Sequence, residues 1–145
     1  MYFGEFAHTL DSEGRLALPA RLREALGDEL TRGLCLSCGA EPCIVATTQE
    51  RFAQMLATVG ADPSIDKSTA RDFKRAIGAR TAVAVPDKQG RVLVPDKLRR
   101  AAGIEKDVVI IGAVDAIEIW DRATYEGRET SRLATFERVA PRVFG

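Results

Sequence analysis

The sequence predicts an α+β protein built from two copies of one small unit, a β-hairpin followed by a helix, with further helices flanking them. Three observations lead to this prediction. A stretch of 17 residues occurs twice, 76 positions apart; short apolar runs bounded by turn residues accompany each copy; and the apolar pattern between the copies changes to that of helices. A unit of roughly 45 residues encloses little core, so we expect the two copies to pack into one pseudo-symmetric β-barrel.

The repeated stretch covers residues 11–27 and 87–103. The two copies align without gaps and are identical at eight positions, which hold Asp, Gly, Arg, Pro, Leu, Arg, Ala and Gly in that order. A weaker likeness continues, after a slip of three positions, into residues 43–52 and 116–125. This agreement indicates an internal duplication.

Both copies are expected to form the same elements in the same order. A first strand leads into an Asp-x-x-Gly turn, in which Asp11 or Asp87 caps backbone N–H groups and the glycine closes a hairpin in the left-handed conformation. A proline then ends the second strand and begins a helix, and a glycine follows the helix. The expected strands are 6–10, 16–18, 34–36 and 44–46, then 82–85, 92–94, 108–111 and 116–120; the expected helices of the copies are 20–26 and 96–102.

The segment between the copies, roughly residues 49–77, carries apolar residues at helical spacing and is broken near 60–63. The tail is expected to be helical from about residue 122 and loose at 141–145. The chain is therefore divided into a first repeat at 1–52, intervening helices at 53–80, a second repeat at 81–125, and a C-terminal helix and tail at 126–145.

The charge of the chain is zero overall but uneven along its length. Residues 67–100 contain ten Lys or Arg and three Asp, a local charge of +7. A modest local patch favours a nucleic-acid binder that presents several copies of its site. The sequence has no apolar run long enough to cross a bilayer and no signal peptide at its start, so we expect a cytoplasmic protein that does not associate with membranes.

Three cysteines, Cys35, Cys38 and Cys43, lie within nine residues. Cys35-x-x-Cys38 fits a redox pair or half of a zinc site, but His8 is the single histidine and there is no second paired motif. We therefore interpret the cysteines as reduced, small apolar residues of a strand and a turn, and expect neither a metal nor a cofactor.

An arginine, Arg15 or Arg91, follows each turn glycine, although the turn itself needs only the aspartate and the glycine. A guanidinium held at a tight loop matches phosphate, or the O6 and N7 acceptors of guanine in the major groove of DNA. The other residues expected to contact DNA lie in the loops and on the helices that follow them: Gly14, Lys88, Gly90, Arg21, Arg23, Lys97 and Arg99. The alternative is that Arg15 and Arg91 pair with Asp11 and Asp87 and merely brace the turns.

These loops, each followed by an apolar strand, a proline and a helix, together with Ile-Glu-Ile-Trp-Asp at 117–121, resemble the MraZ family. The resemblance extends from Phe3 to about Tyr125. It implies a fold of two AbrB-like, swapped-hairpin half-barrels, and it assigns the family's Asp-x-x-x-Arg motif to the four Asp and Arg residues of the loops. Lys88 fits a basic position of the family, whereas Ser12 at the same place in the first copy implies a weaker grip on phosphate.

The resemblance also implies a function. MraZ proteins regulate transcription, usually as repressors, by binding repeated short sites in double-stranded DNA upstream of the gene cluster for cell division and cell-wall synthesis, which includes their own operon. They assemble into homo-oligomeric rings and work at the nucleoid. Residues 46–51 lack the tryptophan and proline often found there in the family, which leaves the packing of the next helix open.

Two other functions remain open. AbrB-like barrels also serve as antitoxins or other protein-interaction modules, although these are usually short, with one copy and a long polar tail where this chain has its second copy. An enzyme is the third class, for instance a thiol oxidoreductase that uses Cys35 and Cys38.

Overall fold

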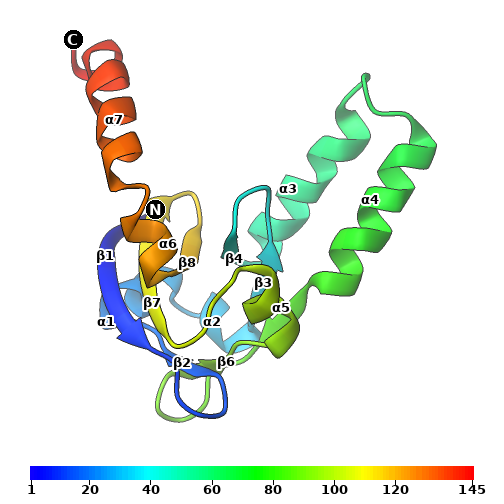
Figure 1. Ribbon diagram of the computed structural model, residues 1–145. Coiled ribbons are helices and arrows are strands. Elements are labelled where there is room, and N and C mark those ends of the chain that lie inside the picture. The colour runs from blue at the N-terminus through cyan, green and yellow to red at the C-terminus, as the bar shows by residue number, and fades with distance from the viewer.

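Eight strands form two antiparallel sheets in the computed structural model, which describes residues 1–145 (Figure 1). The larger sheet has six strands in the order β1-β7-β8-β4-β3-β5, and β2 and β6 form a separate two-stranded sheet. The strands are β1 (Tyr2–Thr9), β2 (Arg15–Ala17), β3 (Leu34–Cys38), β4 (Cys43–Thr48), β5 (Ala82–Ala84), β6 (Arg91–Leu93), β7 (Asp107–Val114) and β8 (Ile117–Asp121).

Seven helices complete the α+β fold, whose class is confirmed. They are α1 (Ala20–Leu26), α2 (Glu29–Arg32), α3 (Gln49–Ala61), α4 (Lys67–Arg80), α5 (Asp96–Ala101), α6 (Arg122–Glu126) and α7 (Glu129–Phe144). Figure 1 shows α3 and α4 projecting together on one side of the sheets and α7 projecting on the other side. The turns after β1 and β5 lie at the end of the molecule opposite these projecting helices.

The prediction that each copy closes its own hairpin is wrong. β1 pairs along its whole length with β7 of the second copy, β5 pairs with β3 of the first copy, and the two return strands β2 and β6 pair with each other. The apolar alternation that makes a segment a strand does not determine its partner, because any strand with a matching apolar face can cover the same core.

The predicted closed barrel is also not found. Closure of the large sheet would require its outer strands β1 and β5 to pair, and neither has a second neighbour. β5 ends after three residues, just before Val85 and Pro86, and proline has no N–H to donate to a ladder. The sheet therefore stays open at both edges.

One core joins both copies. Twenty buried residues form a single cluster, which contains two pairs of equivalent positions of the repeat, Leu16 and Val92, and Leu22 and Leu98, each at most 1% exposed. Burying one such side chain contributes about 1.5–3 kcal/mol. The neighbouring β2–β6 ladder pairs Leu16 directly with Val92. The packing of the copies on each other thus also positions the turns that precede β2 and β6.

Other differences from the predictions are local. The four-residue helix α2 was not expected, and β1 begins four residues earlier than predicted. The tail at 141–145 is not loose, because α7 continues through Pro141 to Phe144. The helices at 49–61 and 67–80 are confirmed, but their apolar stripes are not covered: Ala70 is their only buried residue and Phe73 is 44% exposed.

Candidate nucleic-acid interface

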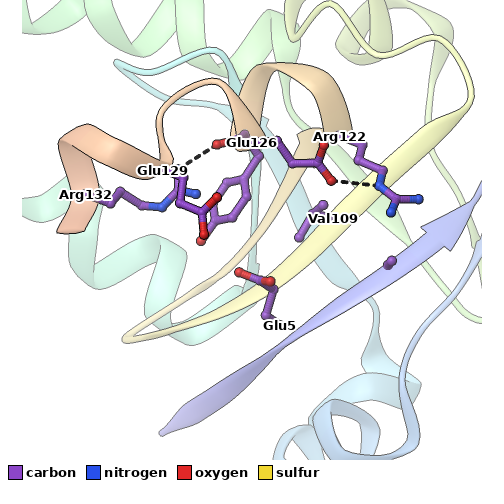
Figure 2. Close-up of a pocket in the computed structure, with 8 residues that line it drawn as sticks. Glu5, Val109, Arg122, Glu126, Glu129 and Arg132 are labelled. Atoms are coloured by element: carbon purple, nitrogen blue, oxygen red, sulfur yellow. Dashed lines mark hydrogen bonds and ion pairs between the residues drawn. The ribbon is translucent and has the colours of Figure 1, made fainter.

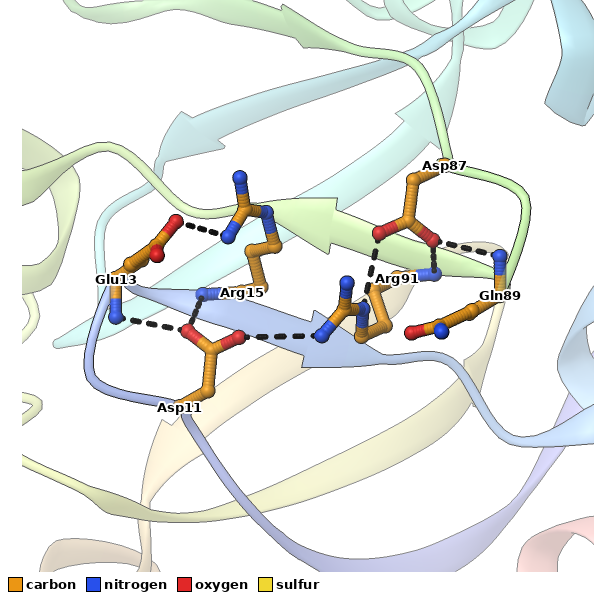
Figure 3. A network of polar contacts seen from close by, with 6 residues as sticks. All are labelled: Asp11, Glu13, Arg15, Asp87, Gln89 and Arg91. Carbon is orange, nitrogen blue, oxygen red and sulfur yellow. Dashed lines mark hydrogen bonds and ion pairs between the residues drawn. The ribbon is translucent and has the colours of Figure 1, made fainter.

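Two loops, residues 11–15 (the first loop) and 87–91 (the second loop), lie beside each other because β2 and β6 pair in antiparallel register. In that ladder Arg15 lies opposite Leu93, and Arg91 lies opposite Ala17. Figure 3 shows both arginine side chains and both loop aspartates converging over this short ladder. The fold therefore brings together the two motifs, which are 76 positions apart in the sequence.

The two turns have the same hydrogen bonds. In the first loop, Oδ1 of Asp11 accepts from the backbone N–H groups of Glu13 and Arg15, both at 2.9 Å. In the second loop, Oδ1 of Asp87 accepts from the equivalent N–H groups at 2.9 and 3.0 Å. The turn glycines have φ angles of +86° and +77°, a region that residues with a Cβ rarely adopt. Each loop is thus a rigid platform for the arginine that ends it.

The hydrogen bonds also affect the aspartates. The backbone N–H of Arg15 lowers the pKa of Asp11 below its usual value, and the backbone N–H of Arg91 does the same for the pKa of Asp87, because both bonds stabilise the charged carboxylate. The two carboxylates are therefore ionised near neutral pH and place negative charge next to the arginines.

The two arginines have different partners (Figure 3). Nε of Arg91 donates to Oδ2 of Asp87 at 2.9 Å, and its Nη1 lies 3.5 Å from Oδ2 of Asp11. Nη1 of Arg15 donates instead to the carboxylate of Glu13. The bracing alternative thus describes the contacts of Arg91 but not those of Arg15. Both side chains remain accessible, at 37% exposure for Arg15 and 35% for Arg91.

Each loop is also covered by an arginine from the other copy. A Cβ built on Gly14 would lie 3.0 Å from the guanidinium carbon of Arg99 in α5, and a Cβ on Gly90 would lie 2.8 Å from Nη1 of Arg23 in α1. The backbones of the two copies are also hydrogen-bonded at this point, since the N–H of Val94 in the second copy donates to the carbonyl of Gly14 in the first at 2.9 Å. Arg23 and Arg99 therefore lie directly over the loop glycines of the opposite copy, a contact that their sequence positions did not reveal.

The remaining predicted site residues are exposed. Ser12 and Lys88 lie at the equivalent second position of each loop, and Arg21 and Lys97 lie on α1 and α5. Sequence reasoning missed Glu13, which is paired with Arg15. Its signal was the contrast with Gln89, the uncharged residue at the same position of the second loop.

The cysteines lie in β3 and β4 and are free. Burial raises the pKa of the Cys35 and Cys38 thiols, and burial with the nearby Glu118 and Glu41 carboxylates raises the pKa of Cys43 to about 12. Activated cysteines have the opposite shift, because they react as thiolates. No group of three or more His, Cys, Asp and Glu side chains is arranged to hold a metal ion.

A second candidate region is a polar cavity of about 290 Å³ where α6 and α7 pack on β1 and β7 (Figure 2). Its two arginines already have partners: Arg122 donates to Glu126 at 2.9 Å, and Arg132 donates to the Tyr125 carbonyl at 2.8 Å while its guanidinium covers the Tyr125 ring. The contact of Arg132 joins α7 to α6.

A larger groove of about 540 Å³ separates α3 and α4 from β3 and β4. It is mostly apolar, and the stripes of the two helices supply much of its lining, including Phe52, Met55, Phe73 and Ile77.

None of the helices of the protein is long and apolar enough to span a bilayer.

Comparison with known proteins identifies relatives of this chain. A family model described as "MraZ protein, putative antitoxin-like" matches residues 1–76 and 79–142. A protein named transcriptional regulator MraZ from Acetivibrio thermocellus is 36% identical over 145 residues, which cover 99% of this chain and 96% of the relative. Proteins of the same name from Lactiplantibacillus plantarum and Cutibacterium acnes are 40% and 34% identical, with at least 96% of each chain covered.

The likeness extends over the whole chain and includes both copies of the repeat. Identity of this level over nearly complete sequences requires a common fold and a common ancestor. The chain therefore belongs to the MraZ family.

Proposed function

We propose that this protein is a DNA-binding transcriptional regulator whose two loops contact double-stranded DNA. The observation that carries the proposal is the placement of two Asp-x-x-Gly-Arg loops side by side, with Arg15 and Arg91 on neighbouring strands and each about one third exposed. Rigid loops lose little conformational entropy on binding, so their arginines are suited to contact phosphate or guanine. The relatives named above are transcriptional regulators by name.

The residues have distinct proposed roles. Arg15, Arg91 and Lys88 contact DNA directly, and Asp11 and Asp87 shape the turns. Supporting contacts come from the rest of the loops and from the helices that follow them: Ser12, Gly90, Arg21, Arg23, Lys97 and Arg99. The exposed members of this set supply positive charge around the loops, while Arg23 and Arg99 also lie over the loop glycines. Gly14, also predicted from the sequence as a contact, is buried and shapes the first turn instead.

The two copies, at 1–52 and 81–125, act as related halves of one DNA-binding unit in this proposal. The exchange of strands supports a swapped, pseudo-symmetric arrangement, because β1 pairs with the second copy and β5 pairs with the first. The segments 53–80 and 126–145 then project from this unit.

We also propose that the protein forms a homo-oligomer, with a ring as the expected form, which binds repeated short sites. Each chain has no net charge, so several linked subunits would be needed to obtain strong binding by avidity. The expected targets are the repeats upstream of the cell-division and cell-wall gene cluster, including its own operon. The protein would repress this cluster from the cytoplasm, at the nucleoid.

The test measures affinity for the DNA upstream of its own operon by fluorescence anisotropy, with wild type, Arg15→Ala and Arg91→Ala. Loss of one well-placed arginine contact costs about 1–3 kcal/mol, so affinity should fall at least fivefold. Arg75→Ala is the control, because Arg75 lies on α4 and pairs with Asp72 outside the loops. Affinity should also fall with salt, with a slope of about −0.9 for each contacted phosphate.

Thermal denaturation distinguishes an arginine that contacts DNA from one that only stabilises its turn. If Arg91→Ala lowered the melting temperature by several degrees, its pairing with the two aspartates would explain the loss of binding. Wild-type affinity in both loop variants, or a flat salt response, would refute the DNA-binding role.

The apolar groove beside α3 and α4 favours a second candidate, an antitoxin or other protein-interaction module. The family description also contains the word antitoxin-like. Phe73→Glu places a charge in the groove, and binding of the variant to a short duplex distinguishes the two functions. Under the DNA-binding proposal, a single subunit of the variant still binds the duplex, and this binding depends on salt. A pure interaction module does not bind the duplex at all.

A further inference from the structure

We propose that Glu13 weakens the grip of the first loop on DNA, so that the two loops of one chain contact the duplex unequally. This inference rests on the proposed DNA-binding function and deepens it. The carboxylate of Glu13 binds the guanidinium of Arg15, the group that the first loop offers to DNA. Phosphate therefore has to compete with this carboxylate for the guanidinium of Arg15.

The two loops differ in charge although they share one geometry. The first loop, Asp-Ser-Glu-Gly-Arg, has a net charge of −1, whereas the second loop, Asp-Lys-Gln-Gly-Arg, has a net charge of +1. The difference comes from two positions, where Ser12 and Glu13 in the first loop stand in place of Lys88 and Gln89. The second loop is therefore the stronger site for phosphate.

The carboxylate of Glu13 has no part in folding the turn. Oδ1 of Asp11 accepts both backbone N–H bonds of the first loop, and Asp87 does the same in the second. The Glu13 side chain is 65% exposed and contacts Arg15 alone among the charged groups. A glutamine serves equally well at this position in the second loop, so the charge of Glu13 is available for a role in binding.

The pairing of Arg15 with Glu13 follows from the way the loops meet. In the second loop, Oδ2 of Asp87 binds Arg91 of its own loop. Oδ2 of Asp11, the equivalent atom of the first loop, lies 3.5 Å from Nη1 of Arg91 and has no hydrogen bond with Arg15. The guanidinium of Arg15 turns instead to Glu13. The asymmetry thus depends on the crossing of the two loops as well as on the sequence of each.

A negative charge beside DNA lowers affinity for every sequence, because it repels the phosphates that all duplexes share. Contacts with base edges are less affected by this repulsion. We therefore infer that Glu13 reduces non-specific binding more than specific binding, and so raises the ratio between them. Glu13 is in this sense a specificity-determining residue of the first loop.

The test compares Glu13→Gln with Glu137→Gln, which removes the same charge from α7, on the side of the molecule opposite the loops (Figure 1). The probes are the DNA upstream of its own operon and a random duplex of equal length. An exposed ion pair contributes little, so Glu13→Gln should bind the random duplex about two- to fivefold more tightly for each engaged loop. Its salt dependence should steepen by about 0.9 if Arg15 gains a phosphate contact.

The reciprocal variant Gln89→Glu should weaken binding to both probes, because it introduces the carboxylate into the second loop. Equal affinities of Glu13→Gln and Glu137→Gln would overturn the inference, and so would an equal gain on both probes, since the charge would then act without regard to sequence. Weaker binding by Glu13→Gln would show that Glu13 supports the loop instead.

A measurement without DNA separates this inference from the proposed function. An α-dicarbonyl reagent modifies accessible guanidinium groups, and peptide mass spectrometry reports each arginine separately. Arg15 should react a few-fold faster in Glu13→Gln than in wild type, while the rate at Arg91 should not change. Unchanged reactivity of Arg15 would refute the masking even if the protein binds DNA, and faster reactivity would support the masking even if the wild type did not bind DNA.

Discussion

The crossed contact between α1 and the second loop makes the substitution Gly90→Ala a sensitive probe of the site. Gly90 has a φ of +77°, and a Cβ there would lie 2.8 Å from Nη1 and 3.3 Å from Cδ of Arg23. Holding a residue with a Cβ in this conformation costs about 1–3 kcal/mol, and Arg23 must also move aside. We expect the variant to lose stability by this amount and to bind DNA more weakly, because both the loop and its arginine support are displaced.

The same chemical change elsewhere should have the opposite sign. Gly78 lies inside the helix α4, and a Cβ at this position would meet no atom within 4 Å. Replacing a mid-helix glycine with alanine stabilises a protein by about 0.5–1 kcal/mol, because the unfolded chain loses freedom. The free energies of unfolding of Gly90→Ala and Gly78→Ala should therefore differ by about 1.5–4 kcal/mol.

The assay is thermal and urea denaturation of both variants and wild type at one protein concentration, since oligomerisation makes the melting temperature depend on concentration. For a chain of this size, the two melting temperatures should lie roughly 5–12 °C apart. DNA affinity should fall only in Gly90→Ala. If Gly90→Ala were as stable as Gly78→Ala, the strained turn and its contact with Arg23 would not exist as described.

Three further predictions concern pH, the core and the cysteines. The pKa of Asp87 is lower in the folded protein than the ordinary 3.8, so its contribution to stability is present above pH 3.8 and is lost as pH falls through the lower folded value. Acid titrations followed by circular dichroism should therefore show a smaller loss of stability between pH 4 and 2 for Asp87→Asn than for wild type. Leu98→Ala should lower the free energy of unfolding by about 2–5 kcal/mol, because Leu98 is 1% exposed in the shared core, and a urea titration showing less than 1 kcal/mol would contradict the core described above. Cys43, whose pKa is about 12, should resist iodoacetamide at pH 8 until urea unfolds the chain, and rapid alkylation in the native state would contradict its burial.

Several features of the site follow from the residues alone. Asp-x-x-Gly predicts a turn capped by a carboxylate and closed by a left-handed glycine, and both loops have this form. The apolar alternation predicts strands, the spacing of three and four predicts α3 and α4, and proline and glycine mark the ends of α1. These features depend on interactions between residues that are close in the chain, so they can be read from a short window of sequence.

Other local expectations did not hold, again for physical reasons. Residues 141–145 were expected to be loose because they end the chain, but α7 continues through Pro141 to Phe144, since the loss of one N–H does not end a helix that is otherwise complete. The arginines were given equal roles, whereas their ion pairs differ: Arg91 lies between two aspartates and Arg15 binds Glu13. Which carboxylate an exposed arginine selects depends on all the charges around it, including those of the other loop.

By itself, the sequence determined that the chain contains a duplicated unit, where its turns lie, and that each turn ends in an arginine, because repetition and turn chemistry are local properties. Only the tertiary structure decided that β2 pairs with β6, that the copies exchange their outer strands, and that Arg23 and Arg99 cover the glycines of the opposite loops. The physical reason is that strand partners are selected by the burial of apolar faces across the whole core, and many pairings satisfy the same alternating pattern until the complete chain has packed.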